Sequence, residues 1–169
     1  MAATTAPALP VTVTVTASAS RTVAPAPADP ENVALAVLQK QQAQDLDSTT
    51  FDGRWVLQVA SKFDGVTDAL QVTRSGSHTF HNVDILSEYR SLRTRLEASG
   101  ITVHLLRSND FGTTTVSHPE RIWVTLADPG GLYSADDAMS ECRSLFPELD
   151  DRHLRNACVG RRLLPPGVS

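Results

Sequence analysis

Cys142 and Cys158 are the two cysteines of the chain, and their positions suggest that they could be joined. Cys142 lies on the apolar stripe of a helix predicted to open at Ser134, and Cys158 lies in the predicted last strand. We expect this strand to pack under the helix, so a disulfide is sterically feasible and would indicate an oxidising compartment. The alternative is a pair of buried free thiols, because cysteine is a common core residue.

The other reactive side chains do not form a recognisable metal or catalytic centre. His78, His81 and Asp84 could donate to a metal, but two histidines at this spacing in a loop are far from a closed site. The stretch Ser75-Gly76-Ser77 lacks the pattern of a nucleophile elbow. The acidic residues that could form a glycosidase pair fall in loops or at a helix start: Glu120, Asp128, Asp136 and Asp137. We therefore expect a protein that is not an enzyme and has no catalytic residue, metal or cofactor.

The elements that must position these side chains form two similar half-units, each in the order strand, helix, strand. The predicted strands are residues 55–61, 101–106, 121–126 and 156–159, and the helices between them end at Gly100 and open at Ser134. This order predicts an α+β domain of ferredoxin-like βαββαβ topology. Such a domain has an antiparallel four-stranded sheet with two helices on one face. Its other face is expected to stay open, where a ligand could bind.

The predicted third strand alternates sharply between two kinds of side chain. Ile122, Val124 and Leu126 are aliphatic and are predicted to face the helices. Arg121 and Trp123 are then predicted to face the open side. A large apolar side chain exposed beside an arginine is unusual and suggests a binding surface. The alternative is that Trp123 packs beneath the N-terminal helix or the long loop after the first strand.

Three segments follow one another along the chain. Residues 1–28 are rich in Thr, Ala and Pro and carry one charge, Arg21, so they are predicted to form a disordered stalk. The pattern Asp29-Pro30-Glu31 is typical of a helix start and predicts a helical linker over residues 29–50. The α+β domain is predicted over residues 51–165, with a long insert at residues 62–82.

The domain resembles a SPOR domain, the sporulation-related repeat that binds bacterial peptidoglycan. The stretch Trp55-Val-Leu-Gln-Val-Ala-Ser61 is similar to the opening strand of that family, and a helix ending in Glu97-Ala-Ser-Gly100 leads to an extended strand as it does there. The second strand-helix-strand half extends the resemblance to about residue 163. The long insert also looks like parts of the outer domains of actinobacterial membrane proteins, including receptor-type Ser/Thr kinases.

The resemblance implies a ligand and a place for it. In the SPOR family the glycan is held on the open sheet face, and the matching positions are Gln58 and Ser61 on the first strand and Arg121 with Trp123 on the third. Aromatic rings stack on sugar rings, while amide and guanidinium groups hydrogen-bond to hydroxyls. The implied function is a non-catalytic module that binds cell-wall peptidoglycan glycan strands. The alternative is a protein-interaction or sensor outer domain of a membrane protein whose sheet face is covered by its own insert.

The composition limits where such a module can act. The 169-residue chain has a formal net charge of −4, which argues against a nucleic-acid surface. No run approaches the roughly 18 apolar residues of a membrane span, and the N-terminus lacks the features of a signal peptide. We expect an extracytoplasmic monomer whose anchor or export signal was removed or belongs to a larger parent chain.

Overall fold

The computed structural model describes residue 2 and residues 28–169 of the chain. The predicted stalk at residues 1–28 therefore lies outside the described residues, apart from its second and last positions. The helices are α1 (Pro30–Ser48), α2 (Asn82–Glu97), α3 (Ala135–Leu145) and α4 (Asp151–Ala157), with a short 3-10 turn η1 (Pro119–Arg121). The strands are β1 (Trp55–Lys62), β2 (Val66–Thr67), β3 (Thr79–Phe80), β4 (Thr102–Arg107), β5 (Trp123–Asp128) and β6 (Val159–Arg162).

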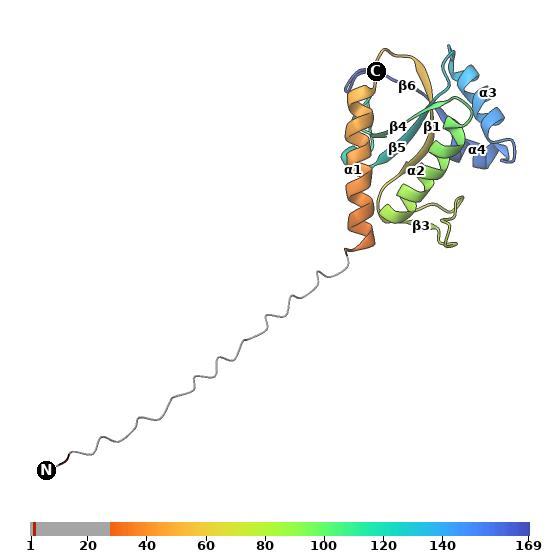
Figure 1. The fold of residues 1–169 in the computed structure, drawn as a ribbon. Coiled ribbons are helices and arrows are strands. Elements are labelled where there is room, and N and C mark those ends of the chain that lie inside the picture. The colour runs from red at the N-terminus through yellow and green to blue at the C-terminus, as the bar shows by residue number, and fades with distance from the viewer. Residues whose placement is uncertain (1, 3–27) are drawn as a thin grey trace.

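Four of the strands form one antiparallel sheet in the order β4-β5-β1-β6. The two remaining strands, β2 and β3, pair only with each other and lie within the predicted insert. Residues of all four helices join the sheet in one apolar cluster, and α2 and α3 lie against the same side of the sheet (Figure 1). The prediction of an α+β domain with a four-stranded antiparallel sheet is confirmed.

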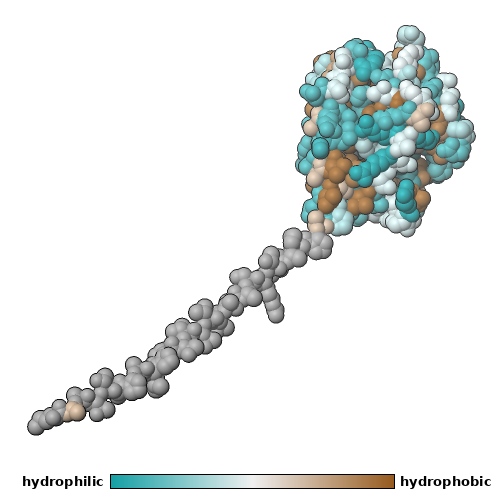
Figure 2. All heavy atoms as spheres, in the orientation of Figure 1, coloured by the Kyte–Doolittle hydropathy of each residue, from teal (hydrophilic) through white to brown (hydrophobic). Residues whose placement is uncertain are grey.

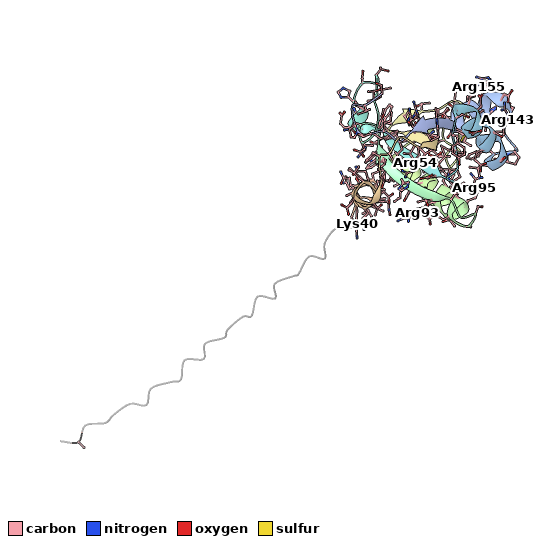
Figure 3. The ribbon with its side chains drawn as sticks, turned by 90° about the horizontal axis from the view of Figure 1, so that it is seen from above. Lys40, Arg54, Arg93, Arg95, Arg143 and Arg155 are labelled. Carbon is pink, nitrogen blue, oxygen red and sulfur yellow. A yellow bond between two sulfur atoms is a disulfide. The ribbon has the colours of Figure 1, made fainter. Side chains whose placement is uncertain are left out.

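Helix α1 packs against the free edge of the sheet at β4 and against α2, and Figure 3 shows it end-on beside the rest of the domain. The Asp29 carboxylate accepts the Glu31 N–H at 3.0 Å, which caps the helix start that the sequence predicted. Near its other end, Asp45 is buried and its Oδ2 accepts the Leu105 N–H of β4 at 2.7 Å. This contact satisfies an edge-strand donor that would otherwise be open to pairing with another chain.

The last strand begins later than the sequence predicted. The Asp150 carboxylate accepts the N–H groups of Arg152 and His153, which starts α4, and this helix extends to Ala157. Residues 156 and 157 are therefore helical, and β6 begins only at Val159. Cys158 is the single residue between α4 and β6 and is not part of the strand itself.

The Cys142–Cys158 disulfide is present and links α3 to the start of β6. Both cysteines are buried, at 0% and 1% exposure. The sequence left two buried thiols as the alternative, and the structure resolves this in favour of the bridge.

The predicted orientation of β5 is wrong. Trp123 is 3% exposed and belongs to the cluster that faces the helices, whereas Val124 and Leu126 point to the opposite face. The guanidinium of Arg107, the residue paired with Trp123 on β4, stacks 3.0 Å from the centre of the indole. Both sides of β5 are apolar enough to be buried, so alternation alone did not reveal which side the helices cover.

The sheet face expected to be open carries a second apolar cluster. Val56, Leu106 and Leu126 are fully buried there, in contact with Phe111 from the loop after β4 and Leu163 from the C-terminal segment. The predicted insert at residues 62–82 does not provide this cover. It packs on the helix side, where Phe80 joins the first cluster and the Asn156 amide of α4 donates to Asp68.

Candidate functional site

A β-bulge in β1 places Gln58 and Ser61 on the same face of the sheet. Gln58 pairs with Leu126 and Ser61 pairs with Val124, because the register between β1 and β5 shifts between Gln58 and Ala60. In a regular strand, residues three apart point to opposite faces. The extra residue brings both side chains to the face away from the helices.

The side chain of Gln58 lines a cleft of about 370 Å³ on this face. Its other walls come from the loop after β4, from β6 and from the C-terminal segment. The polar side chains in the lining include Ser108, the threonines at 113–115, Arg161 and Ser169. Backbone hydrogen bonds fix the walls, since the Gly112 N–H donates to the Leu164 carbonyl and the Gly167 N–H donates to the Gly112 carbonyl.

The cleft is lined by hydrogen-bonding groups more than by ionisable ones. The Arg161 Nε donates to the Gln58 Oε1 at 3.0 Å, which orients the carboxamide in the cleft wall. The threonine hydroxyls can both donate and accept. Among the described lining residues there is no carboxylate side chain, histidine or cysteine to act as general base or nucleophile. This chemistry suits the binding of a hydroxyl-rich ligand.

The four residues predicted to bind glycan are not brought together. Gln58 lines the cleft, and Ser61 is exposed on the same face without lining it. Arg121 is exposed in η1, and Trp123 is buried beside it on the helix side. Burial also lowers the pKa of Arg107, which covers the indole of Trp123, to about 10. Trp123, which was predicted to stack on a sugar ring, is therefore part of the hydrophobic core.

Sequence reasoning missed the rest of the cleft, which comes from segments far apart in the chain. The stretch Thr113-Thr-Thr115 and the pair Arg161-Arg162 are visible in the sequence as polar runs beside predicted strands. They read as ordinary connections, because nothing local shows that the loop and the C-terminal segment meet over β1. Only the contact of Phe111 and Leu163 with the same sheet face explains their proximity.

His104 is a buried titratable group on this face of the sheet. It pairs with Leu126 across the β4–β5 ladder and is 8% exposed, with its Nδ1 lying 3.2 Å from the Thr49 hydroxyl. Burial lowers the pKa of His104 below its usual value, against an opposing effect of the nearby Asp45 carboxylate. Burial thus favours the neutral imidazole, which suits a structural role.

Residues 28–169 contain no group of three His, Cys, Asp or Glu side chains placed to hold a metal ion. Within the same part of the chain, none of the helices combines the length and apolar character needed to cross a bilayer.

Comparisons with known proteins found no relative of this chain. No family model matches the sequence, and no curated protein or solved structure matches it significantly. The cleft must therefore be interpreted from its own geometry.

Proposed function

We propose that this chain is a non-catalytic, extracytoplasmic module that binds a cell-wall glycan strand in the cleft beside Gln58. The observation that carries the proposal is the position of Gln58 in the cleft wall, next to the hydroxyls of the 113–115 loop, with Ser61 turned to the same sheet face by the bulge in β1. Amide, hydroxyl and guanidinium groups are the partners that sugar hydroxyls need. The buried disulfide supports an oxidising, extracytoplasmic location.

The strand order supports a ferredoxin-like, SPOR-like assignment for the domain. In the order β4-β5-β1-β6 the two strands of each half-unit are separated by one strand of the other half, as a βαββαβ chain requires. The proposed binding surface differs from the one expected from the resemblance, because Trp123 and Arg121 do not take part. The glycan would instead be held by Gln58, Arg161 and the threonine loop.

A second candidate function is a protein-interaction or sensor outer domain of a membrane protein. The observation that favours it is the covering of the central sheet residues Val56 and Leu126 by the loop after β4 and the C-terminal segment. This cover narrows the surface available to a long glycan. The two candidates predict different results in a binding assay with cell-wall material.

The test is retention of the full chain on purified peptidoglycan sacculi. In a Gln58→Ala/Arg161→Ala variant, the loss of about 1.4 kcal/mol of hydrogen bonding weakens retention about tenfold. Arg155→Ala is the matched control, since it removes an exposed arginine of α4 away from the cleft. Equal retention of the double variant and the wild type would remove the cleft from consideration, and no retention of either protein would favour the second candidate.

A further inference from the structure

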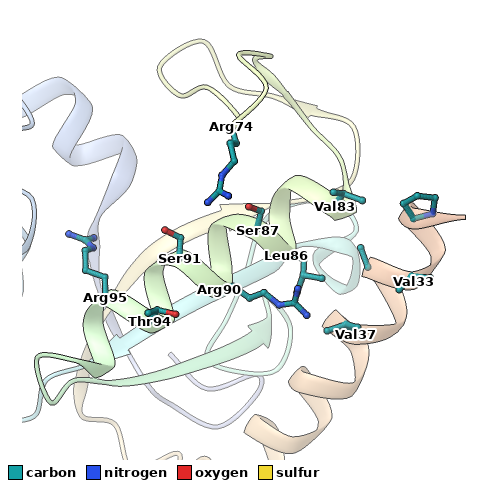
Figure 4. Close-up of a pocket in the computed structure, with 12 residues that line it drawn as sticks. Val33, Val37, Arg74, Val83, Leu86, Ser87, Arg90, Ser91, Thr94 and Arg95 are labelled. Carbon is teal, nitrogen blue, oxygen red and sulfur yellow. The ribbon is translucent and has the colours of Figure 1, made fainter.

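A groove of about 790 Å³ lies between α1 and α2, on the helix side of the domain (Figure 4). Ala34 and Leu86 are buried at its floor, while Val33 and Val83 remain 48% and 40% exposed at one end. Figure 2 shows hydrophobic atoms gathered where these ends of α1 and α2 lie side by side. The groove therefore offers apolar surface to a partner at one end.

The charged side chains of the groove are all positive. Arg74, Arg90 and Arg95 line it, and no Asp or Glu of residues 28–169 does so, although the whole chain has a net charge of −4. In Figure 4, Arg74 reaches over α2 from the insert and Arg90 extends toward α1. Within residues 28–169, no carboxylate lies in ion-pair distance of Arg74 or Arg90.

Arg95 differs from the other two because its position is fixed. Its guanidinium stacks 4.6 Å from the centre of the Phe146 ring, and its Nη1 donates to the Leu145 carbonyl at 2.9 Å. These contacts use the flat face and one donor, and they add no negative charge. An arginine that is already ordered loses less side-chain entropy when it binds a carboxylate.

We infer that this groove binds an acidic peptide segment of a partner protein, anchored by an apolar side chain at the Val33–Val83 end. The inference stands apart from the glycan proposal, because it uses a different surface and a different ligand chemistry. Positive charge around an apolar floor matches a ligand of opposite charge with one apolar residue. The three arginines would also speed association with such a segment.

The spacing along α2 defines the form of the ligand. At 1.5 Å per residue, Leu86 and Arg90 are about 6 Å apart along the axis, and Arg90 and Arg95 about 7.5 Å. Alternate residues of an extended chain are about 6.6 Å apart. An extended peptide with an apolar residue over Leu86 thus places a carboxylate near Arg90 at its second following position, whereas Arg95 projects about 140° further around α2, toward the end of α3. The short side chains of Ser87, Ser91 and Thr94 leave room for its backbone.

The segment that precedes α1 in this sequence does not have this character. Residues 1–28 contain no Asp or Glu and cannot supply the carboxylates. A partner protein is therefore the occupant that the charges favour.

The test uses the full chain and a fluorescein-labelled peptide of sequence leucine-serine-glutamate-serine-glutamate, with the glutamine analogue as the neutral probe. Fluorescence polarisation at low salt should show the acidic peptide binding about tenfold more tightly than the neutral one. Arg74→Gln/Arg90→Gln should abolish that preference, and Arg152→Gln/Arg155→Gln on α4 should preserve it as a charge-matched control. Raising the salt concentration should weaken the preference.

Three results would overturn the inference. The first is equal affinity for the two peptides. The second is an equal loss of binding in the control variant. The third is a concentration-dependent dimer, detected by sedimentation, that the groove variant dissociates, because this result would assign the groove to a second copy of the chain. The Gln58→Ala/Arg161→Ala variant should bind the acidic peptide as the wild type does, so this test and the glycan test can fail separately.

Discussion

Removing the disulfide should cost the domain a large part of its stability. The perturbation is Cys142→Ala/Cys158→Ala, which eliminates the link between α3 and the start of β6 without leaving an unpaired thiol. The bridge restricts the unfolded chain by closing a loop, since the two cysteines are 16 residues apart in sequence. Chain-entropy reasoning for a loop of this size gives about 3 kcal/mol.

A loss of core packing adds to this loss of loop-closure stabilisation. Both cysteines are buried in the core cluster, so the variant also loses the packing of two sulfur atoms against the residues around them. We therefore expect the free energy of unfolding to fall by about 3 to 4 kcal/mol. This corresponds to a decrease in the urea midpoint of about 1.5 to 2 M if the m-value is about 2 kcal/mol/M.

The assay is urea unfolding followed by tryptophan fluorescence, with the variant and the wild type in the presence and absence of a reductant. The reductant should lower the midpoint of the wild type towards that of the double variant and leave the variant unchanged. Ser144→Ala, on the exposed side of the same helix, is the control for a change in α3 alone. A double variant within about 1 kcal/mol of the oxidised wild type would refute the reasoning, because the loop-closure contribution would then be absent.

Two further predictions concern the packing and protonation of the sheet. Gly160→Ala should lower the free energy of unfolding by about 1 to 3 kcal/mol, measured by the same urea assay, because the new Cβ would lie 2.7 Å from the Cβ of Ala138. A Gly160→Ala protein as stable as the wild type would mean that α3 can move away at no cost. For His104, whose pKa is lowered by burial, the unfolded chain binds the proton more readily, so stability should fall as the pH drops below about 6.5. His104→Gln should flatten that part of the stability profile, and an unchanged slope would show that other groups cause it.

The sequence predicted where the helices and strands lie better than which side of each one is buried. The Asp29 cap, the Ser134 helix start and the opening strand at Trp55 are local signals, and each agrees with the structure to within a residue or two. The end of the chain was harder, because residues 156 and 157 were predicted as strand but belong to α4, so that β6 begins only at Val159.

In the candidate site, too, residues could be chosen from the sequence more easily than the face on which their side chains lie. Gln58 was selected from the resemblance of the opening strand, whereas the placement of Ser61 on the same face depends on a bulge that no pattern in β1 reveals. Trp123 was placed on the wrong face, since its neighbours on both sides of β5 are apolar. The deciding contact is with Arg107, a residue that is distant in sequence and adjacent in the sheet.

Local patterns were enough to predict most of the helices and the strands of the main sheet, because caps, turns and apolar periods act over a few residues. The sequence also identified the two cysteines as possible partners. The packing of distant segments showed that the cysteines are joined, which face of β5 meets the helices, and which segments cover the opposite face. These outcomes depend on contacts between residues far apart in the chain, such as Phe111 with Leu163, and the pairing of such residues is not encoded in any local pattern.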